Sequence, residues 1–213
     1  MAPNKFNMAI ATLKYLKELG FEEIILRTDK ITQYKKFVQD VKECKRCELH
    51  KNRLNAVPGS GSIYSRLVII GEAPGEKEDK IGIPFVGPSG QKLNTYLKEI
   101  GLKREDVYIT NVVKCRPPHN REPTIEEVSI CREFLDFEIQ FLKPEIILLL
   151  GNIALEYITG ERKGIMKRRG NVFSYKNMIV LPTYHPSFIL SNPFKEEEIK
   201  RDFQILKEIY YAY

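Results

Sequence analysis

The sequence predicts an α/β fold in which helices lie on both sides of a mainly parallel sheet. Short, wholly apolar runs rich in β-branched residues recur along the chain and end at glycine or at polar residues, as buried parallel strands do. Longer segments with apolar residues at helical spacing separate these runs, so that strands and helices alternate. The predicted strands are 67–71, 107–113, 146–150 and 178–181.

Two helices are predicted before the first strand. The segment 6–20 has apolar residues at helical spacing and ends at a glycine, and 31–41 is a second helix that leads into Cys44. Between them, 24–26 is a brief apolar run followed by a polar break. The segment 55–62 contains one proline and two glycines and is a predicted loop.

The other helices are predicted from their caps and stops. Ser89 can cap a helix that continues through Ile100. Thr124 begins a helix to about residue 142, and Glu127, three positions on, completes a capping box. A short helix after the third strand ends at Gly160, and a final helix spans roughly 195–210.

Length and composition bound the function. The chain has 213 residues, 43% of them hydrophobic, and a net charge of +6, which suits one globular domain with an anionic partner such as nucleic acid. Disorder is excluded as the main state, since apolar residues run through the whole length. No apolar run approaches the roughly 20 residues that span a bilayer, and the first residues are an amphipathic helix rather than a secretory signal. We expect a cytoplasmic monomer that does not bind membranes, and the abundance of Lys, Glu and Ile without Trp is common in heat-adapted proteins.

The four cysteines suggest a metal centre. Cys44 and Cys47 form a C-x-x-C pair, while Cys115 and Cys131 lie far downstream. Structural disulfides are not expected in a cytoplasm, and four thiolates suit zinc or a four-iron cluster. The wide second spacing is closer to a cluster than to a zinc ribbon. The alternatives are an unrelated zinc-stabilised protein, or buried core thiols at the last two positions.

Unusual residues gather in the loops that follow the strands, where α/β folds bind ligands. The loop after the first strand begins Gly71-Glu72-Ala73-Pro74-Gly75-Glu76, a tight turn whose amides can face a ligand. It continues to Pro84-Phe85-Val86-Gly87, whose aromatic ring is suited to stacking on a flat ligand. The alternatives are a generic acidic loop and a phenylalanine tucked into the core.

Two further polar residues end predicted strands. Asn111 lies within an otherwise apolar strand, and its amide can pair with the edge of a base or tie adjacent loops together. His185 opens the sequence His185-Pro186-Ser187 after the last strand, where an imidazole could stabilise a developing anion. The chain's other histidines, His50 and His119, lie in polar loops.

A basic cluster precedes the last strand. It carries five positive charges within eight residues and fits either a phosphate-gripping loop or a solvated basic loop. Its members are Arg162, Lys163, Lys167, Arg168 and Arg169.

Together these motifs resemble the family 4 uracil-DNA glycosylases, the iron–sulfur type of thermophilic bacteria and archaea. The resemblance covers about residue 37 to the C-terminus and leaves the N-terminal helical extension, which we place at 1–33, outside a glycosylase-like domain at 34–213. The matching residues are the C-x-x-C pair, 71–76, 84–87, 110–118 (Thr-Asn-Val-Val-Lys-Cys-Arg-Pro-Pro), Cys131 and 185–187.

The resemblance implies a three-layer α/β/α sandwich with a central four-stranded, mainly parallel sheet. It implies a structural 4Fe–4S cluster held by Cys44, Cys47, Cys115 and Cys131. It implies removal of uracil from single- or double-stranded DNA by hydrolysis of the N-glycosidic bond, after the base has left the helix stack. The product is an abasic site, which begins base-excision repair.

The resemblance also implies roles for the motif residues. Phe85 would stack on uracil, Asn111 would pair with its polar edge, and His185 would support negative charge on the departing base. Amides around Gly71, Glu72 and Ala73 would contact the base.

The group that handles the attacking water is left open. Better-known uracil glycosylases place an Asp or Asn where this chain has Ala73, so we expect Glu72 to position the water. Glu78 is the second choice, and could instead exclude the methyl group of thymine. Ser187, Ile189 and Leu190 are candidate DNA contacts, and Ile189 or Leu190 could wedge into the space that the base vacates.

Rival functions remain at this stage. They are a glycosylase for another deaminated base, such as hypoxanthine or xanthine, and a cluster-bearing DNA-binding module without catalysis. A monofunctional enzyme is expected, because no lysine in the motif loops stands out as a Schiff-base nucleophile. The C-terminal segment 204–211 resembles in part a sliding-clamp-binding peptide, although Lys207 occupies a position that should be aliphatic.

Overall fold

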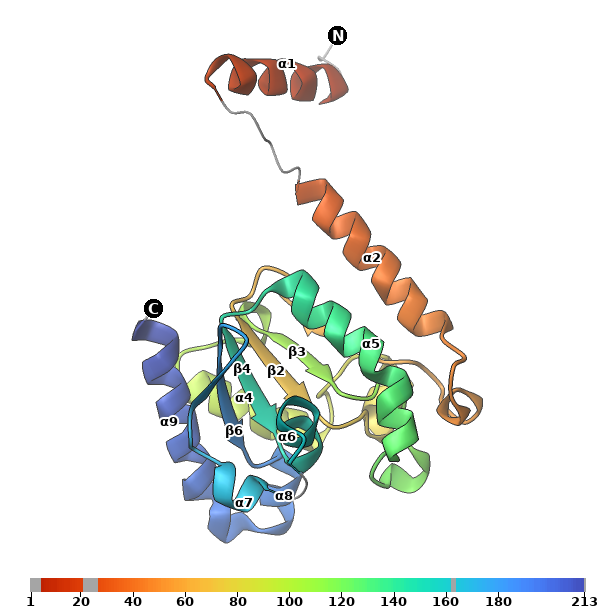
Figure 1. The fold of residues 1–213 in the computed structure, drawn as a ribbon, viewed down its shortest axis with the longest axis vertical. Coiled ribbons are helices and arrows are strands. Elements are labelled where there is room, and N and C mark those ends of the chain that lie inside the picture. Colours follow the sequence, from red (N-terminus) through yellow and green to blue (C-terminus); the bar gives the residue numbers. More distant parts are fainter. Residues whose placement is uncertain (1–4, 21–26, 162–163, 213) are drawn as a thin grey trace. The chain divides into compact units, whose positions relative to one another are not determined.

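The computed structural model describes residues 5–20, 27–161 and 164–212. The chain divides into two compact units, residues 1–39 and 40–213 (Figure 1). In chain order the elements are α1 Lys5–Glu18, α2 Arg27–Glu43, η1 Glu48–Lys51, β1 Ser60–Gly61, β2 Leu67–Gly71, α3 Glu76–Ile81, α4 Pro88–Glu99, η2 Arg104–Asp106, β3 Tyr108–Asn111, η3 Pro118–Asn120, α5 Ile125–Leu142, β4 Ile146–Leu150, α6 Asn152–Thr159, α7 Ile165–Arg168, β5 Phe173–Tyr175, β6 Met178–Thr183, α8 Pro186–Ser191, η4 Pro193–Lys195 and α9 Glu196–Ala212.

The first unit is helical, as predicted. It contains α1 and most of α2, which confirm the helices expected at 6–20 and 31–41. The apolar run at 24–26 lies outside the described residues. The boundary that we predicted after residue 33 falls within α2, and the division between the two units along the chain follows Gln39.

The second unit is built on one sheet with the strand order β1-β3-β2-β4-β6-β5. The central strands β3, β2, β4 and β6 are parallel, which confirms the predicted four-stranded sheet. Two short strands, β1 and β5, extend it at its edges in antiparallel pairing. They were not predicted, because two or three residues without an apolar run carry no strand pattern.

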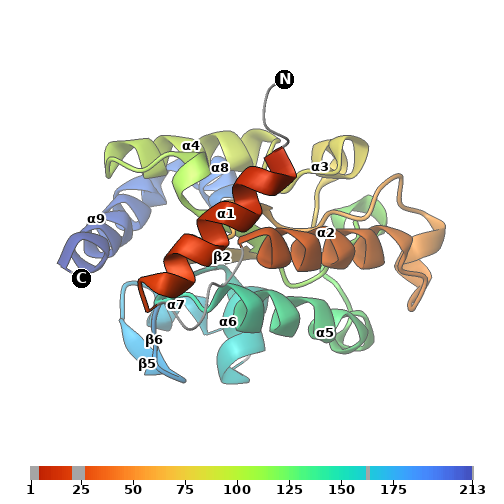
Figure 2. The same cartoon turned by 90° about the horizontal axis from the view of Figure 1, so that it is seen from above.

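Helices cover both faces of the sheet and give the predicted three layers. Figures 1 and 2 show α4, α8 and α9 on one face and α5 and α6 on the other. Every residue of β2 and β4 is buried. Burial on both faces explains why these strands are apolar throughout, since each buried aliphatic side chain contributes about 1.5–3 kcal/mol.

The predicted capping box positions the start of α5. Thr124 Oγ1 accepts a hydrogen bond from the Glu127 backbone N–H at 3.2 Å, and Glu127 Oε2 accepts one from the Thr124 N–H at 2.7 Å. Arg121 also pairs with the Glu127 carboxylate, at 2.7 Å. These bonds lower the pKa of Glu127 and fix the loop that leads from β3 into α5.

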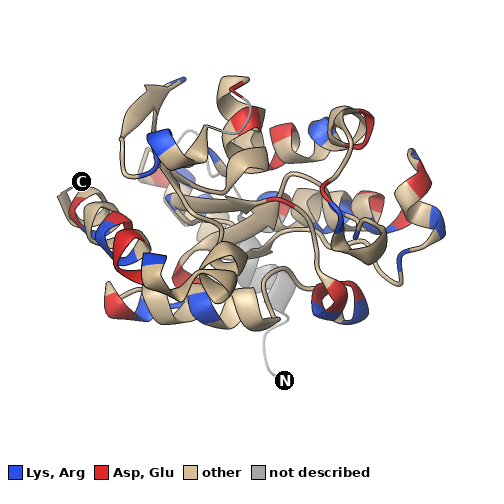
Figure 3. Ribbon diagram, turned by 90° about the horizontal axis from the view of Figure 1, so that it is seen from below, with Lys and Arg blue, Asp and Glu red and all other residues tan. Residues whose placement is uncertain are grey.

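The C-terminal helix α9 packs on the body of the second unit. Its residues Ile199, Phe203 and Leu206 are buried, and the helix also carries both acidic and basic residues (Figure 3). The segment 204–211 therefore belongs to a packed helix and is not a free peptide, which argues against the predicted clamp-binding segment. None of the described helices has the length and apolar character needed to cross a membrane.

Candidate active site

A cavity of about 690 Å³ lies at the carboxyl ends of the parallel strands. The three loops that the sequence singled out, after β2, β3 and β6, all line it. This follows from the topology, because neighbouring parallel strands end at the same edge of the sheet. Gly151, Asn152, Ile165 and Met166, which the sequence analysis did not single out, complete the wall after β4.

Phe85 presents an aromatic ring to this cavity. The residue is 5% exposed, and its ring centroid lies 5.5 Å from that of His185. Gly71, the last residue of β2, lies directly against the ring, since a Cβ there would come within 2.5 Å of Phe85 Cζ. A glycine is therefore required at this strand end for the ring to reach the cavity.

Asn111 ends β3 and brings an unsatisfied acceptor to the same place. The residue is 2% exposed, and its Oδ1 finds no hydrogen-bond partner among the described residues. A Cβ at Gly71 would come within 2.5 Å of this oxygen. A carbonyl oxygen in a cavity wall that pairs with no protein donor can accept a hydrogen bond from a ligand N–H.

His185 is held in one tautomer by the helix that it caps. As the N-cap of α8, its Nδ1 accepts a hydrogen bond from the Ser187 backbone N–H at 3.1 Å, and the Ser187 hydroxyl lies 2.6 Å from the same nitrogen. The proton of the neutral ring is therefore on Nε2. Burial lowers the pKa of His185 to about 4, so the ring is a neutral N–H donor at pH 7.

Glu72 supplies the cavity with a carboxyl group of raised pKa. Burial, and to a lesser extent the negative charge of Glu122, raise the pKa of Glu72 to about 7. A carboxyl group that titrates near the working pH is suited to accept and release a proton. Ala73 beside it also lines the cavity and has no polar side-chain atom.

Glu78 lies on α3 and also lines the cavity. Its Oε1 accepts hydrogen bonds from the backbone N–H groups of Val86 and Gly87, at 2.8 and 2.7 Å. The carboxylate thus anchors the turn that carries Phe85. Its predicted roles in handling water or excluding a methyl group stay predictions.

The four cysteines gather at a second, smaller cavity. Cys44 and Cys47, Cys115 in the loop after β3, and Cys131 on α5 all line it, and all four are free thiols. Arg53 Nη1 donates to Cys115 Sγ at 2.8 Å, and the Lys114 backbone N–H donates to Cys131 Sγ at 3.3 Å.

The walls and donors of this cysteine cavity fit an iron–sulfur cluster, which requires several thiolates in an apolar shell with N–H donors to sulfur. Apolar walls come from Val41, Val113, Ile130 and Phe134. Within the described ranges, no three His, Cys, Asp or Glu side chains converge closely enough to bind a single metal ion.

A buried ion pair that the sequence analysis missed joins the cysteine loop to Asn111. Lys114 Nζ donates to Glu138 Oε2 at 2.6 Å and to the Asn111 carbonyl oxygen at 2.7 Å, and both charged side chains are 1% exposed. Thr110 and Tyr108 also donate to the Glu138 carboxylate, each at 2.8 Å. The one signal in the sequence is a lysine directly after an apolar strand, and it does not identify a partner 24 residues away.

The basic cluster is divided by the structure. Arg162 and Lys163 lie outside the described residues. Lys167 is exposed, and Arg168 pairs with Glu161 at 3.3 Å. Arg169 donates to both Asp202 oxygens, at 2.5 and 3.0 Å, and to the Glu198 carbonyl. These donors of Arg169 hold α9, and its contact with DNA stays a prediction.

The two candidate wedge residues have opposite environments. Ile189 is 1% exposed and belongs to the core, which favours its neighbour as the wedge, and insertion of either side chain into a duplex stays a prediction. Leu190, next to it on α8, is 43% exposed. Ser187 is exposed at the rim of the cavity, with its hydroxyl 2.6 Å from His185 Nδ1, and its contact with DNA stays a prediction.

Known proteins are similar to this chain over most of its length. The family model described as the uracil DNA glycosylase superfamily matches residues 58–207. A type-4 uracil-DNA glycosylase of Thermotoga maritima is 48% identical over 163 residues, which cover 76% of this chain and 84% of that protein. Proteins of the same name from Sulfurisphaera tokodaii and Archaeoglobus fulgidus are 45% and 42% identical, covering 82% and 81% of this chain and 83% and 90% of those proteins.

Proposed function

The chain belongs to the type-4 group of the uracil-DNA glycosylase superfamily, and we propose that it hydrolyses the N-glycosidic bond of deoxyuridine in DNA. The membership confirms the resemblance that the motifs indicated. The product is an abasic site, from which base-excision repair proceeds. The observation that carries the proposal is the unsatisfied Asn111 Oδ1 beside an aromatic ring in a cavity large enough for a base.

Base recognition follows from the geometry of Asn111. Uracil presents an N–H donor at N3 and a carbonyl acceptor at O4, which complement the oxygen and the NH₂ group of one amide. Cytosine presents the reverse pattern, and an amide held in the orientation that binds uracil would leave both groups unpaired, which a buried site penalises strongly. Phe85 offers a stacking face to the extruded base, worth about 1–3 kcal/mol.

His185 stabilises the leaving group. As the glycosidic bond lengthens, negative charge develops on uracil, and an Nε2–H donor placed in the cavity lowers the free energy of that state. Because the ring is neutral, it stabilises the anion by hydrogen bonding and does not have to transfer a proton. The sugar passes through an oxocarbenium-like state that water attacks.

Glu72 is the group that we assign to the water. Its carboxyl lines the cavity and has a pKa of about 7, so near neutrality about half of the molecules carry the carboxylate that can orient water and accept its proton. Ala73 leaves space beside it. The assignment makes excision depend on a single ionisation near pH 7.

The reaction that we propose is simple hydrolysis. Lys114 donates to three acceptors, and Lys77 lies on the exposed surface of α3 at the cavity rim. Borohydride added during turnover is expected to trap no covalent complex with DNA. A trapped complex that the Lys77→Gln variant fails to form would replace hydrolysis by an imine route.

We further propose that Cys44, Cys47, Cys115 and Cys131 hold a 4Fe–4S cluster with a structural role. When bound, the cluster ties the C-x-x-C segment to the loop after β3 and to α5. Purified protein should contain about four iron atoms per chain, absorb broadly near 400 nm, and lose both on Cys131→Ala substitution. Zinc in place of iron would contradict the proposal.

The cellular setting is also proposed from composition. Four free cysteines suit a reducing cytoplasm, and abundant Lys and Glu without Trp suit a heat-adapted protein. We expect the chain to be monomeric, with residues 1–33 as an extension of the glycosylase domain. Size-exclusion chromatography tests the monomeric state, a melting curve tests the heat adaptation, and a variant lacking 1–33 tests whether these residues are an extension.

The test of function uses end-labelled oligonucleotides with one uracil, single-stranded or paired with G or A. Thymine and hypoxanthine oligonucleotides are controls, and alkali cleaves any abasic site. Cleavage at uracil alone is expected from cluster-loaded protein. Cleavage at hypoxanthine alone would assign another deaminated base, and DNA binding without cleavage would assign a binding module.

A further inference from the structure

The backbone of Phe85 has an unfavourable conformation for its residue type. Its φ is +54°, in the left-handed region that residues other than glycine seldom occupy. Such a conformation persists only where the surroundings fix it, and it is found mostly at functional sites. The groups that fix Phe85 therefore determine where its ring lies in the cavity.

Arg104 holds one side of this turn. Its Nη1 donates to the Phe85 carbonyl oxygen at 2.9 Å, and its Nη2 donates to the Pro84 carbonyl and to Ser60 Oγ, the latter at 3.2 Å. Two consecutive carbonyls thus point at one guanidinium group. A planar fork of donors can satisfy such a pair, and a lysine ammonium cannot match its geometry.

Glu78 holds the other side. The carbonyls of residues 84 and 85 face the cation, and the next two N–H groups, of Val86 and Gly87, face the Glu78 carboxylate. Gly90 on α4 closes the arrangement, since a Cβ there would lie 1.9 Å from the Phe85 carbonyl oxygen. Three consecutive peptide groups, 84–85, 85–86 and 86–87, are therefore held between opposite charges.

We propose that Arg104 and Glu78 are positioning residues that hold Phe85 in its left-handed conformation, so that its ring faces the extruded base. This inference rests on the proposed excision of uracil and deepens it. It names two residues, besides the motif glycines and the base-pairing asparagine, on which the stacking of the base depends. Arg104 is absent from the cavity wall, so its effect on the reaction passes through the turn.

The test is a double-mutant cycle with Phe85→Ala and Arg104→Gln, measured as single-turnover excision of uracil from single-stranded DNA. Losing the stacked ring should slow excision by about 5- to 150-fold, the value of one stacked base. In the wild-type background, Arg104→Gln should slow excision by at least about 5-fold, but by no more than Phe85→Ala does. In the Phe85→Ala background, the same substitution should slow excision by less than about 2-fold. Equal losses in both backgrounds would overturn the inference.

Conservative variants separate positioning from general stability. Glu78→Gln keeps an oxygen that can accept both N–H groups and should stay within about 3-fold of wild type, whereas Glu78→Leu should behave like Arg104→Gln. If Arg104→Gln does not fold, Arg104→Lys replaces it in the cycle, and the same loss is expected only when Phe85 is present. A Glu78→Gln variant as slow as Glu78→Leu would contradict the anchoring role.

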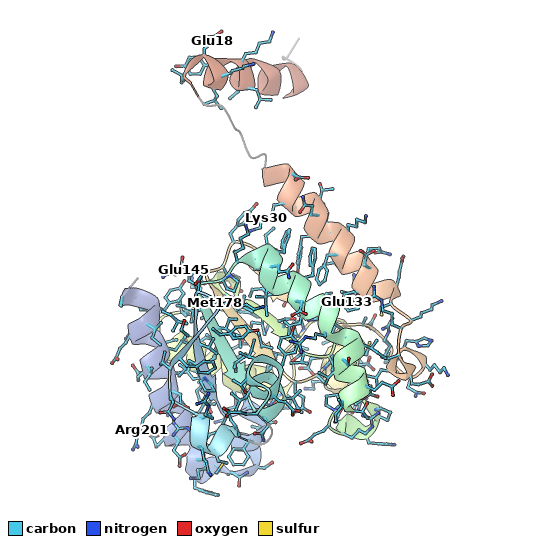
Figure 4. The ribbon with its side chains drawn as sticks, viewed as in Figure 1. Glu18, Lys30, Glu133, Glu145, Met178 and Arg201 are labelled. Carbon is cyan, nitrogen blue, oxygen red and sulfur yellow. The ribbon has the colours of Figure 1, made fainter. Side chains whose placement is uncertain are left out.

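The matched control is Arg66→Gln. Arg66 pairs with Glu145 at the opposite end of the sheet, and its guanidinium group lies over the Tyr210 ring. Glu145 and Met178 are labelled at this end in Figure 4. This variant should lower the melting temperature without a Phe85-dependent change in excision. If wild-type protein excises no uracil, the proposed function fails; if it does and the cycle is additive, only the positioning inference fails.

Discussion

The rings of Phe85 and His185 face the same cavity with their centroids 5.5 Å apart and their planes tilted by 38°. A base sandwiched between two rings needs about 7 Å, since each carbon–carbon contact takes about 3.5 Å. The spacing therefore lets one ring stack on the base face while the other reaches the base edge. The geometry is consistent with the separate roles proposed for them, base binding by Phe85 and leaving-group stabilisation by His185.

Asn111→Leu should stabilise the protein while it abolishes excision. The substitution removes a buried oxygen that has no partner within the described structure, and a leucine of similar shape should raise the free energy of unfolding by about 1 kcal/mol. Excision should fall at least about 100-fold, because the site can no longer pair with uracil. Urea denaturation and single-turnover kinetics measure the two effects. A destabilised variant would show that Oδ1 has a partner in the free protein.

The pH dependence of excision should report Glu72. Its folded pKa of about 7 lies above the ordinary 4.5, so kcat/KM should rise tenfold per pH unit up to about pH 7 and then level off. His185, with a pKa of about 4, should cause no further change in kcat/KM between pH 5 and 9. The Glu72→Gln variant should be slow and independent of pH. A limb that survives this substitution would assign the ionisation to another group.

The same ionisation affects stability with a definite sign. Because folding raises the Glu72 pKa, the buried carboxylate is unfavourable, and the contribution of this residue is lost as the pH rises through about 7. The melting temperature of wild type relative to the Glu72→Gln variant should therefore fall between pH 5 and pH 8. A constant difference would mean that Glu72 is not desolvated.

Phe85→Gly and Phe85→Ala form a pair that isolates the backbone. Both remove the stacking ring and should slow excision equally. Glycine accepts a φ of +54° freely, whereas alanine retains the penalty of the left-handed region, so the glycine variant should be more stable by about 1 kcal/mol. Chemical denaturation compares them, and a more stable alanine variant would contradict the strained turn.

The sequence predicted the centre of the sheet well, for a physical reason. β2 and β4 match the predicted strands residue for residue, because strands buried on both faces must be apolar throughout. β1, β5 and the six-residue α3 were missed, since short polar segments carry no periodic pattern. Those elements depend on the sheet and the loops against which they pack.

The site was predicted where residues follow strands and missed where long-range pairing decides. Asn111 ends a strand, and Phe85 and His185 follow strands, so the parallel topology must bring the three together. The partners of Arg104 lie 19 to 44 positions away, and those of Arg169 lie 29 to 33 positions away, so a charge count could not distinguish either from a DNA-binding side chain. Only the folded structure shows that both guanidinium groups donate to partners within the protein.

Lys114 and Glu138 should each be needed for stability only while the other is present. Removing one partner leaves a buried charge unpaired, so Glu138→Leu or Lys114→Met alone should cost about 3–5 kcal/mol of unfolding free energy. The double variant should recover most of that loss. Because Lys114 also holds the Asn111 carbonyl, excision by the double variant should stay reduced even where its stability returns. Full recovery of both would make the pair a packing element alone.

Lys167 and Arg169, two positions apart, should respond oppositely to neutralisation. Lys167 is exposed on α7, and a phosphate contact there releases a counterion, so Lys167→Gln should weaken DNA binding, lower the salt slope of log K by about 1 and leave the melting temperature unchanged. Arg169 is bound to Asp202 and stacks over Tyr184, so Arg169→Gln should lower the melting temperature and leave the salt slope intact. Fluorescence anisotropy over a salt series, with melting curves on the same samples, measures both. An Arg169→Gln variant that melts like wild type but loses salt slope would restore this arginine to the DNA interface.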